Sequence, residues 1–249
     1  MEVAQAIMIA QIFDISLSTR GGGHGYTCQG AKAGGIMLDM RKLTGMKLHR
    51  ASDGHSDHIS SMTIGTGYTW GAVLKELRQV DKNLVVVHGQ CTSVGVAGYS
   101  LHGGVHFGGL SELYGLASDN ILGLTAVVAN GSTVELTSTS CVIDGIRTSY
   151  SDECRGLFFA FRGAGSSYGV VTSLTLQLHT QPKLQSALSI ISLQIDNSHQ
   201  AQKYLSSYME KIPKEGMSCM PYLYSQSIFT SSENFHRNSV VTATFINHI

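Results

Sequence analysis

The sequence lacks an excess of either charge, since 17 lysines and arginines balance 17 aspartates and glutamates over 249 residues. Proteins that bind nucleic acid or an anionic membrane usually carry a basic surplus, so we expect neither kind of partner. A long apolar run is also missing. The longest, 121–129, is far shorter than the roughly 20 residues that cross a bilayer. These absences favour a small neutral or anionic ligand.

Cysteine is scarce and arranged without a recognisable framework. The five residues are Cys28, Cys91, Cys141, Cys154 and Cys219. An odd number at wide spacings, with no Cys-x-x-Cys pair, indicates neither a disulfide scaffold nor a zinc ribbon. The first residues likewise lack the basic start and small-residue cleavage site of a secretory leader. The sequence therefore leaves the cellular compartment undefined.

Glycine is abundant and clustered, with 28 residues concentrated in four segments, whereas proline occurs only three times. The clusters span 21–25, 30–35, 95–109 and 163–169. Because glycine has no Cβ, it lets the main chain come within contact distance of a ligand. The clustering indicates loops specialised for close approach.

Helix and strand signals alternate along the chain. Apolar residues recur at helical spacing over 3–10, 70–84 and 201–212. Alternating or continuous apolar runs predict strands at 14–20, 35–39, 84–88, 174–178, 189–195 and 238–246. Asn130-Gly131 between two apolar runs predicts a hairpin, because Asn-Gly supplies the positive φ angles of a tight turn. The pattern predicts an α+β protein with a boundary near Pro182.

The first stretch that could carry chemistry is RGGGH, from Arg20 to His24. A dinucleotide fingerprint of the form G-x-G-x-x-G would need a third glycine where Tyr26 stands, and no helical pattern follows. The Rossmann interpretation therefore fails. A purely structural turn remains an alternative for this stretch taken alone.

The second stretch is GQCTSVGVAGYSLHGG, from Gly89 to Gly104. Its cysteine, Cys91, follows an apolar run and precedes small residues, so a flat ligand could lie against the backbone there. Taken alone, Cys91 would more often be a buried, inert thiol. A hydrolase built on Cys91 and one of the histidines is a further alternative, but no triad signature supports it.

Four strings in this order, RGGGHGYTCQG, GQCTSVGVAGYSLHGG, GLASDN and FRGAGSSYGVVTSLTLQLH, resemble the vanillyl-alcohol-oxidase/p-cresol-methylhydroxylase (PCMH-type) superfamily of FAD-linked oxidases. The likeness is greatest to its berberine-bridge-enzyme-like and oligosaccharide-oxidase branch. It covers roughly residues 1–180 and implies a two-lobed FAD-binding domain over 1–182. Residues 183–249 would then begin an α/β substrate-binding domain with an antiparallel sheet.

The resemblance implies that FAD is bound covalently at two residues. His24 matches the histidine attached to the 8α-methyl group of the flavin, and Cys91 matches the cysteine attached to flavin C6. An imidazole nitrogen and a thiolate are suitable nucleophiles for an electron-poor ring. The other implied cofactor-binding residues are Arg20, Gly21, Gly22, Gly23, Gly25, Gln90, Thr92, Ser93, Val94, Gly95, Gly98, Gly103, Asp119, Asn120, Gly169 and Val170.

The activity implied is oxidation of an alcohol or sugar by hydride transfer to flavin, with O2 as acceptor. Val94 matches a position where a small residue is associated with oxygen access to the flavin. Relatives extend beyond both ends of this chain and carry their catalytic base after the position that corresponds to Ile249, so no base is assigned. We also expect a monomer and, for a longer form, secretion. The alternative is a flavin-binding fragment that lacks the base and the complete substrate sheet.

Departures from the family pattern concern histidines. His102 and His106 stand in and after the cysteine stretch, where glycine is commoner, and their i, i+4 spacing weakly suggests a metal. A second histidine-rich run places potential ligands at His49, Asp53, His55, Asp57 and His58. Polar loops of this kind are more often simply solvated, so we expect no metal.

Overall fold

The computed structural model describes residues 2–51, 58–107 and 109–182 with their side chains, except that of Ser166. Beyond these it describes the backbone of strands at 184–194, 217–227 and 237–248, and helical positions 203, 206 and 207. The chain divides into two compact units, one formed by 1–106 and 114–181 and the other by 107–113 and 182–249. The predicted α+β class is confirmed.

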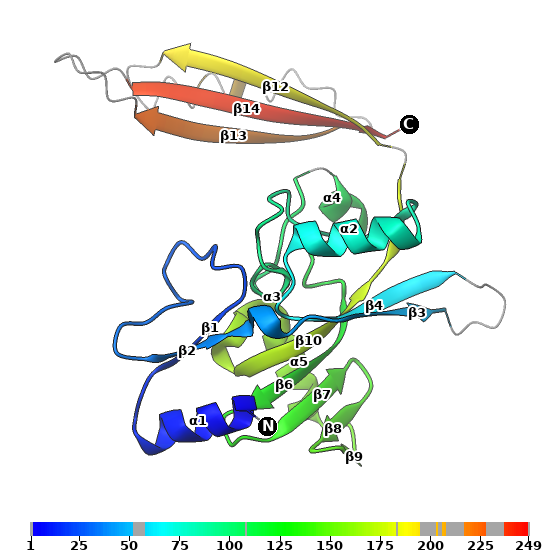
Figure 1. The fold of residues 1–249 in the computed structure, drawn as a ribbon. Helices are drawn as coiled ribbons and strands as arrows, with labels where there is room; N and C mark the ends of the chain where they lie inside the picture. The colour runs from blue at the N-terminus through cyan, green and yellow to red at the C-terminus, as the bar shows by residue number, and fades with distance from the viewer. Residues whose placement is uncertain are drawn as a thin grey trace. The chain divides into compact units, whose positions relative to one another are not determined.

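A seven-stranded antiparallel sheet runs through the first unit, in the order β3-β4-β10-β6-β7-β8-β9 (Figure 1). The strands are β3 Met46–Arg50, β4 Ile59–Gly65, β6 Ile121–Val128, β7 Thr133–Thr137, β8 Cys141–Ile143, β9 Ile146–Thr148 and β10 Gly169–Gln177. At the centre, Leu174 of β10 lies opposite Leu124 of β6, and both are buried. The predicted strand at 174–178 is thus the second half of a longer one.

Helices cover this sheet and complete its core. They are α1 Glu2–Ile12, α2 Trp70–Val80, α3 Val96–Leu101 and α5 Asp152–Ala164, with short 3-10 turns η1 Met40–Lys42 and η2 Gly165–Ser167. A further helix, α4, spans Leu110–Tyr114, and its residues up to Leu113 belong to the second unit. Trp70, Val73 and Leu77 of α2 lie in the main core cluster. Helix α2 ends four residues before the predicted end, because Asp81 adopts an extended conformation (φ −153°, ψ 123°).

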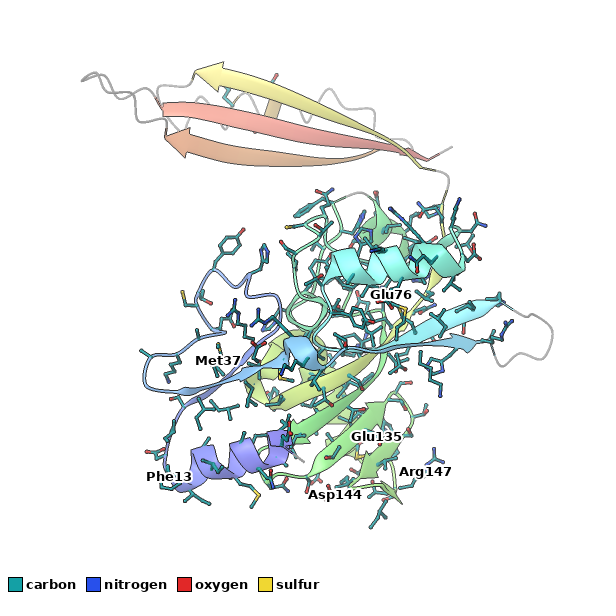
Figure 2. All side chains as sticks on the ribbon, in the orientation of Figure 1. Phe13, Met37, Glu76, Glu135, Asp144 and Arg147 are labelled. Carbon is teal, nitrogen blue, oxygen red and sulfur yellow. A yellow bond between two sulfur atoms is a disulfide. The ribbon has the colours of Figure 1, made fainter. Side chains whose placement is uncertain are left out.

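Helix α1 buries only one side. Ile7 lies in a second core cluster with Met40 and Val170, whereas Phe13, just after the helix, is 67% exposed and points away from the unit (Figure 2).

Two small sheets complete the first unit. Strand β1 Leu17–Arg20 pairs in parallel with β2 Ile36–Asp39, and β5 Leu84–Val85 pairs with β11 His179–Thr180. Strand β5 is shorter than the predicted 84–88. Val86 and Val87 are buried without strand pairing, which shows why a buried apolar run alone does not fix strand length.

The predicted hairpin is confirmed at β6 and β7. Of the two positive φ angles predicted for Asn130-Gly131, only that of Gly131 is found, at +85°; Asn130 instead accepts a hydrogen bond at its Oδ1 from the amide of Ser132 over 2.9 Å. Across the turn, Ala126 lies opposite Val134, and both are buried. The turn chemistry and the apolar pattern therefore set the same register.

The second unit contains a three-stranded antiparallel sheet in the order β12-β14-β13. The strands are β12 Leu184–Gln194, β13 Met217–Ser227 and β14 Arg237–His248. The two predicted strands lie in β12 and β14, while β13 was not predicted. It contains Pro221, which an edge strand tolerates. The predicted helix at 201–212 lies mostly outside the described residues, of which 203, 206 and 207 are helical.

Candidate functional site

The RGGGH stretch and the cysteine stretch meet through two glycines. The first begins at the last residue of β1, and the second begins after β5 and runs through α3. A Cβ added to Gly22 would lie 2.3 Å from the backbone nitrogen of Gly95, and one added to Gly95 would lie 2.4 Å from the nitrogen of Gly22. Side chains at these positions would force the loops apart. The sequence suggested that the glycines admit a ligand, and the structure adds that these two let the loops contact each other.

Where the two loops meet, His24 and Cys91 both contact the hydroxyl group of Ser93. Nε2 of His24 lies 2.7 Å from Oγ of Ser93, and Sγ of Cys91 lies 3.2 Å from the same oxygen. The separation between Nε2 and Sγ therefore cannot exceed the sum of these distances. All three residues are exposed. The two predicted nucleophiles thus lie together on an accessible surface of the first unit.

The thiol of Cys91 is not the buried, inert group that its residue type alone would suggest. It is a free, exposed thiol whose pKa is lowered by the hydrogen bond from the Ser93 side chain, and further by backbone hydrogen bonds from Ser93 and Val94. A lower pKa raises the thiolate fraction near neutral pH, and the thiolate is the nucleophile. Sequence reasoning included Ser93, but could not show that it contacts both nucleophiles.

The cysteine loop, which we define as the segment between β5 and α3 that carries Cys91, is held by backbone hydrogen bonds from the start of α2. The amide of Trp70 donates to the carbonyl of Val94 over 3.0 Å, and that of Gly71 to the carbonyl of Thr92 over 2.8 Å. Within the loop, the amide of Val94 donates to the carbonyl of Cys91 over 3.2 Å. Because Trp70 is fully buried, the helix gives the loop a rigid support.

Two pairs of aromatic side chains pack close to this loop. The ring of Trp70 contacts Tyr99 edge-on with centroids 5.4 Å apart, and His88 contacts His106 edge-on at 4.7 Å. Burial, followed by the charge on His88, lowers the pKa of His106 to about 4. Burial raises the pKa of Tyr99. The extra imidazole at His106 is therefore half-buried against His88 and largely neutral near pH 7.

The predicted residues Asp119 and Asn120 make internal contacts. The side chain of Asn120 is buried, donates to the carbonyls of Tyr114 and Leu116 over 2.9 and 2.8 Å, and lies 2.6 Å from Nε2 of His179. Asp119 is exposed and accepts from the amide of Leu116 over 2.9 Å. In this structure these hydrogen bonds shape the turn before β6.

The remaining predicted residues divide into two groups. Those on the two loops are exposed or half-exposed, apart from the buried Gly95: Arg20, Gly21, Gly22, Gly23, Gly25, Gln90, Thr92, Val94, Gly98 and Gly103. Gly169 and Val170 begin β10 instead. The side chain of Val170 lies in the core cluster with α1, and a Cβ on Gly169 would lie 2.5 Å from the carbonyl oxygen of Val127. The second group lies within the sheet.

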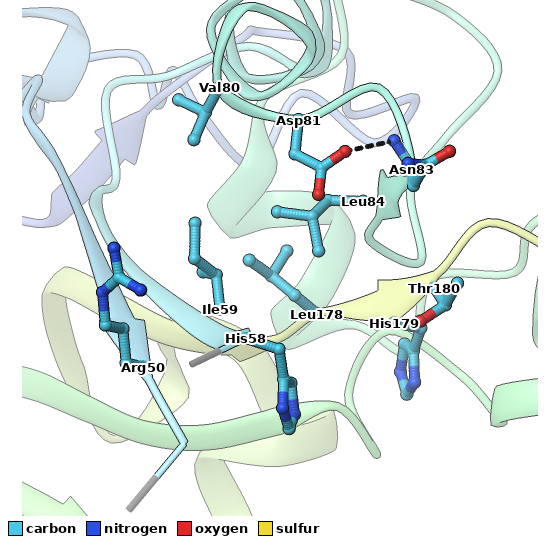
Figure 3. Close-up of a pocket in the computed structure, with 10 residues that line it drawn as sticks. All are labelled: Arg50, His58, Ile59, Val80, Asp81, Asn83, Leu84, Leu178, His179 and Thr180. Carbon is cyan, nitrogen blue, oxygen red and sulfur yellow. Dashed lines mark hydrogen bonds between the residues drawn. The ribbon is translucent and has the colours of Figure 1, made fainter. Parts of the chain in front are cut away.

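A separate hollow of about 730 Å³ lies at the far end of α2 (Figure 3). Its lining consists of Arg50, His58, Ile59, Val80, Asp81, Asn83, Leu84, Leu178, His179 and Thr180. Trp70 begins α2 at the cysteine loop and Val80 ends it at the hollow, so roughly 15 Å of helix separates the two. The hollow is therefore a different place from the His24–Cys91 pair.

The sequence missed one covalent link. Cys141 of β8 and Cys154 of α5 form a disulfide, whereas Cys28 and Cys91 are free. A separation of 13 residues without a motif gave no signal for this pair. The disulfide joins the start of α5 to the outer strands of the sheet.

Neither a metal centre nor a membrane span is found in the described part of the chain. Within it, no three histidine, cysteine or acidic residues gather as metal ligands, and no helix is long and apolar enough to span a membrane. Of the histidine-rich candidates, Asp53, His55 and Asp57 lie outside the described residues. His49 lies 2.8 Å from Oγ1 of Thr63 through its Nε2, and Nδ1 of His102 lies 2.8 Å from the carbonyl oxygen of Gly98.

Comparison with known proteins decides the family. Residues 1–137 match the family described as "FAD binding domain", which is more than half of the chain. The chain belongs to this FAD-binding family. The predicted membership of the vanillyl-alcohol-oxidase/PCMH-type superfamily is confirmed, and FAD is the ligand that the family implies.

The curated relatives of this chain include several oxidases, together with proteins named FAD-dependent monooxygenases and FAD-linked oxidoreductases. (R)-6-hydroxynicotine oxidase of Paenarthrobacter nicotinovorans is 35% identical over 73% of this chain and 34% of its own length. Xylooligosaccharide oxidase of Thermothelomyces thermophilus is 30% identical over 86% of this chain and 39% of its own. The crystal structure of 6-hydroxy-D-nicotine oxidase from Arthrobacter nicotinovorans has a TM-score of 0.71 at 30% identity, over 98% of this chain and 47% of that one. The chain thus spans between a third and a half of the length of these relatives.

Proposed function

We propose that this chain is the flavin-carrying part of an FAD-dependent oxidoreductase that oxidises an alcohol or sugar. The observation that carries the proposal is the accessible pair of His24 and Cys91, joined by the Ser93 hydroxyl inside an FAD-binding domain. FAD would be attached to both residues. The names of the relatives, which include a xylooligosaccharide oxidase and a hydroxynicotine oxidase, support an oxidase.

The positions of the two nucleophiles fit a flavin. The 8α-methyl group is a substituent of the benzenoid ring that contains C6, so residues attached to these two carbons must lie near each other beside that ring. His24 and Cys91 meet this requirement through their shared contact with Ser93. Their exposure leaves the approach open, and the lowered pKa of Cys91 favours the reactive thiolate.

When bound, the flavin would accept a hydride from a substrate C–H bond and pass two electrons to dioxygen. The chain's part is to hold the ring from two attachment points, which limits its rotation and fixes the substrate-facing side. The half-exposed Val94 lies three residues after Cys91 and packs partly against the core. We propose that its small side chain leaves dioxygen a path to the ring.

The remaining cofactor contacts are proposed on the two glycine loops and the segments behind them. Backbone N–H groups of the loop residues would bind flavin and pyrophosphate oxygens. The domain limits proposed are 1–182 for FAD binding and 183–249 for the start of the substrate-binding part. The antiparallel sheet β12-β14-β13 would contribute to the substrate site.

The test of this proposal is flavin retention after denaturation. The full chain is incubated with FAD and precipitated with acid, and flavin absorbance is measured in the washed pellet. We expect the wild type, His24→Ala and Cys91→Ala to retain flavin, each single variant through the other residue. The double variant should release it. Cys28→Ala, which removes the other described free thiol, is the matched control and should behave as the wild type. Acid-stable flavin on the double variant would refute the assignment.

The oxidase part of the proposal has its own measurement. Xylooligosaccharides or other alcohols are added to the flavin-loaded chain without oxygen, and flavin bleaching is followed before air is admitted. Bleaching followed by hydrogen peroxide release supports the proposed activity. A flavin that dithionite reduces but no alcohol or sugar reduces would refute this activity for the chain and favour the alternative, a flavin-binding fragment that lacks the catalytic base.

A further inference from the structure

Ser93 lies between the two proposed attachment residues, and its hydroxyl contacts both of them. Its Oγ lies 2.7 Å from Nε2 of His24 and 3.2 Å from Sγ of Cys91. A serine hydroxyl carries one proton and two lone pairs, so it can donate one hydrogen bond and accept another at the same time. The oxygen can therefore link the protonation of the imidazole to that of the thiol.

Two arrangements of the hydrogen bonds along these three groups differ in reactivity, and the second holds one proton fewer, which the thiol has released to solvent. In one, the thiol donates to Ser93 and Ser93 donates to Nε2, which leaves the sulfur protonated and unreactive. In the other, Nε2–H donates to Ser93 and the hydroxyl donates to Sγ, which stabilises the thiolate. The second arrangement also leaves the lone pair of the neutral imidazole on Nδ1. Only this arrangement makes both side chains nucleophilic together.

We propose that Ser93 is a positioning residue for flavin attachment, whose hydroxyl accepts from Nε2–H of His24 and donates to Sγ of Cys91. It holds the two nucleophiles at a fixed separation and in their reactive protonation states. This inference rests on the bicovalent attachment proposed above. It goes further by assigning a role to a residue that would form no bond to FAD.

The backbone around Ser93 supports this role. Val94, the next residue, is held by two backbone hydrogen bonds, one with Trp70 of α2 and one with Cys91. On the other side, the carbonyl oxygen of Ser93 lies 2.8 Å from where a Cβ on Gly22 would stand. The backbone of Ser93 is thus held in contact with both loops, which keeps its hydroxyl close to His24 and Cys91.

Each attachment is an oxidation with a simple balance. In each attachment a flavin C–H bond is replaced by one C–N or C–S bond, and the side chain gives up one proton, from the N–H of His24 or, before attack, from the S–H of Cys91. The two protons and two electrons that are lost leave with dioxygen as hydrogen peroxide. Ser93 takes no part in this balance, because it only relays hydrogen bonds.

The first experiment needs no flavin. The rate at which iodoacetamide alkylates Cys91 is measured between pH 6 and pH 9 by peptide-resolved mass spectrometry. Without the Ser93 hydroxyl the pKa of Cys91 should rise, and each unit of rise slows alkylation near neutral pH about threefold. We expect this for Ser93→Ala, with the wild-type profile restored in Ser93→Thr. Cys28 in the same chain is the internal reference, and Ser138→Ala, on the exposed turn after β7, is the matched control.

The second experiment follows attachment itself. FAD is added to the wild type and to the same variants, and flavin-bearing His24 and Cys91 peptides are quantified over time. We expect both to form at least several-fold more slowly in Ser93→Ala and at the wild-type rate in Ser93→Thr and Ser138→Ala. If the wild type forms neither adduct, the bicovalent proposal itself fails. If the wild type forms both and Ser93→Ala forms them equally fast with an unchanged alkylation profile, only the role of Ser93 is refuted.

Discussion

Replacing Gly22 by alanine should separate the two loops that carry His24 and Cys91. The new Cβ would lie 2.3 Å from the nitrogen of Gly95 and 2.8 Å from the carbonyl oxygen of Ser93, whereas ordinary contacts begin at 3.4 Å. The loops would have to move apart by about 1 Å, since all the atoms in contact are backbone. A 2.7 Å hydrogen bond between His24 and Ser93 would not survive such a displacement.

The cost of this overpacking is about 1–3 kcal/mol of unfolding free energy. In a chain of this size each kcal/mol corresponds to about 2–4 °C in the melting temperature. Urea unfolding gives the stability, and the flavin-attachment rate at His24 gives the local effect. Gly156→Ala is the matched control, because Gly156 lies on α5 with open space around its Cβ position. A Gly22→Ala chain with wild-type stability and wild-type attachment would refute the packing described for these loops.

Three further predictions concern the scaffold. Reducing the Cys141–Cys154 disulfide should lower the unfolding free energy by about 3 kcal/mol, read from urea midpoints with and without a phosphine reductant, and an unchanged midpoint would contradict the bond. Asn120→Ala should cost about 2–4 kcal/mol in the same assay, because it leaves the buried hydrogen-bonding groups around it without partners, and a loss below 1 kcal/mol would contradict this. His106 has a folded pKa near 4 against 6.5 in the unfolded chain, so the folded state binds fewer protons between these values. The free energy of unfolding should therefore fall as the pH drops from about 6.5 to about 4. In His106→Gln it should depend less steeply on pH over this range. An equal pH dependence in the variant and the wild type would count against the burial of His106.

Local signals in the sequence predicted much of the fold. The β6–β7 hairpin follows from Asn130-Gly131, whose turn chemistry acts over four residues. Helix α2 follows from its apolar spacing, which requires only one buried face. By contrast, β13 was missed, because Pro221 interrupts the strand pattern and only its edge position makes it acceptable. The end of β5 was misplaced because it depends on pairing with the distant strand β11, and the end of α2 because Asp81 adopts an extended conformation.

The sequence indicated candidate residues for the site, but it did not indicate the contacts between them. Family resemblance indicated His24, Cys91 and Ser93, since each stands in a recognisable string. The contact of Gly22 with Gly95 joins segments more than 70 residues apart, and no local pattern encodes such a pair. The disulfide between Cys141 and Cys154 is a further long-range contact of this kind. Tertiary packing, more than local preference, decides these features.

The most direct test of the account is the identity of the peptides that carry flavin. The full chain is incubated with FAD in air, denatured, digested and analysed by mass spectrometry under conditions that preserve C–N and C–S bonds. We predict one flavin joining the peptide that contains His24 to the peptide that contains Cys91. Flavin found on other peptides, or both peptides recovered unmodified from a chain that has bound FAD, would contradict it.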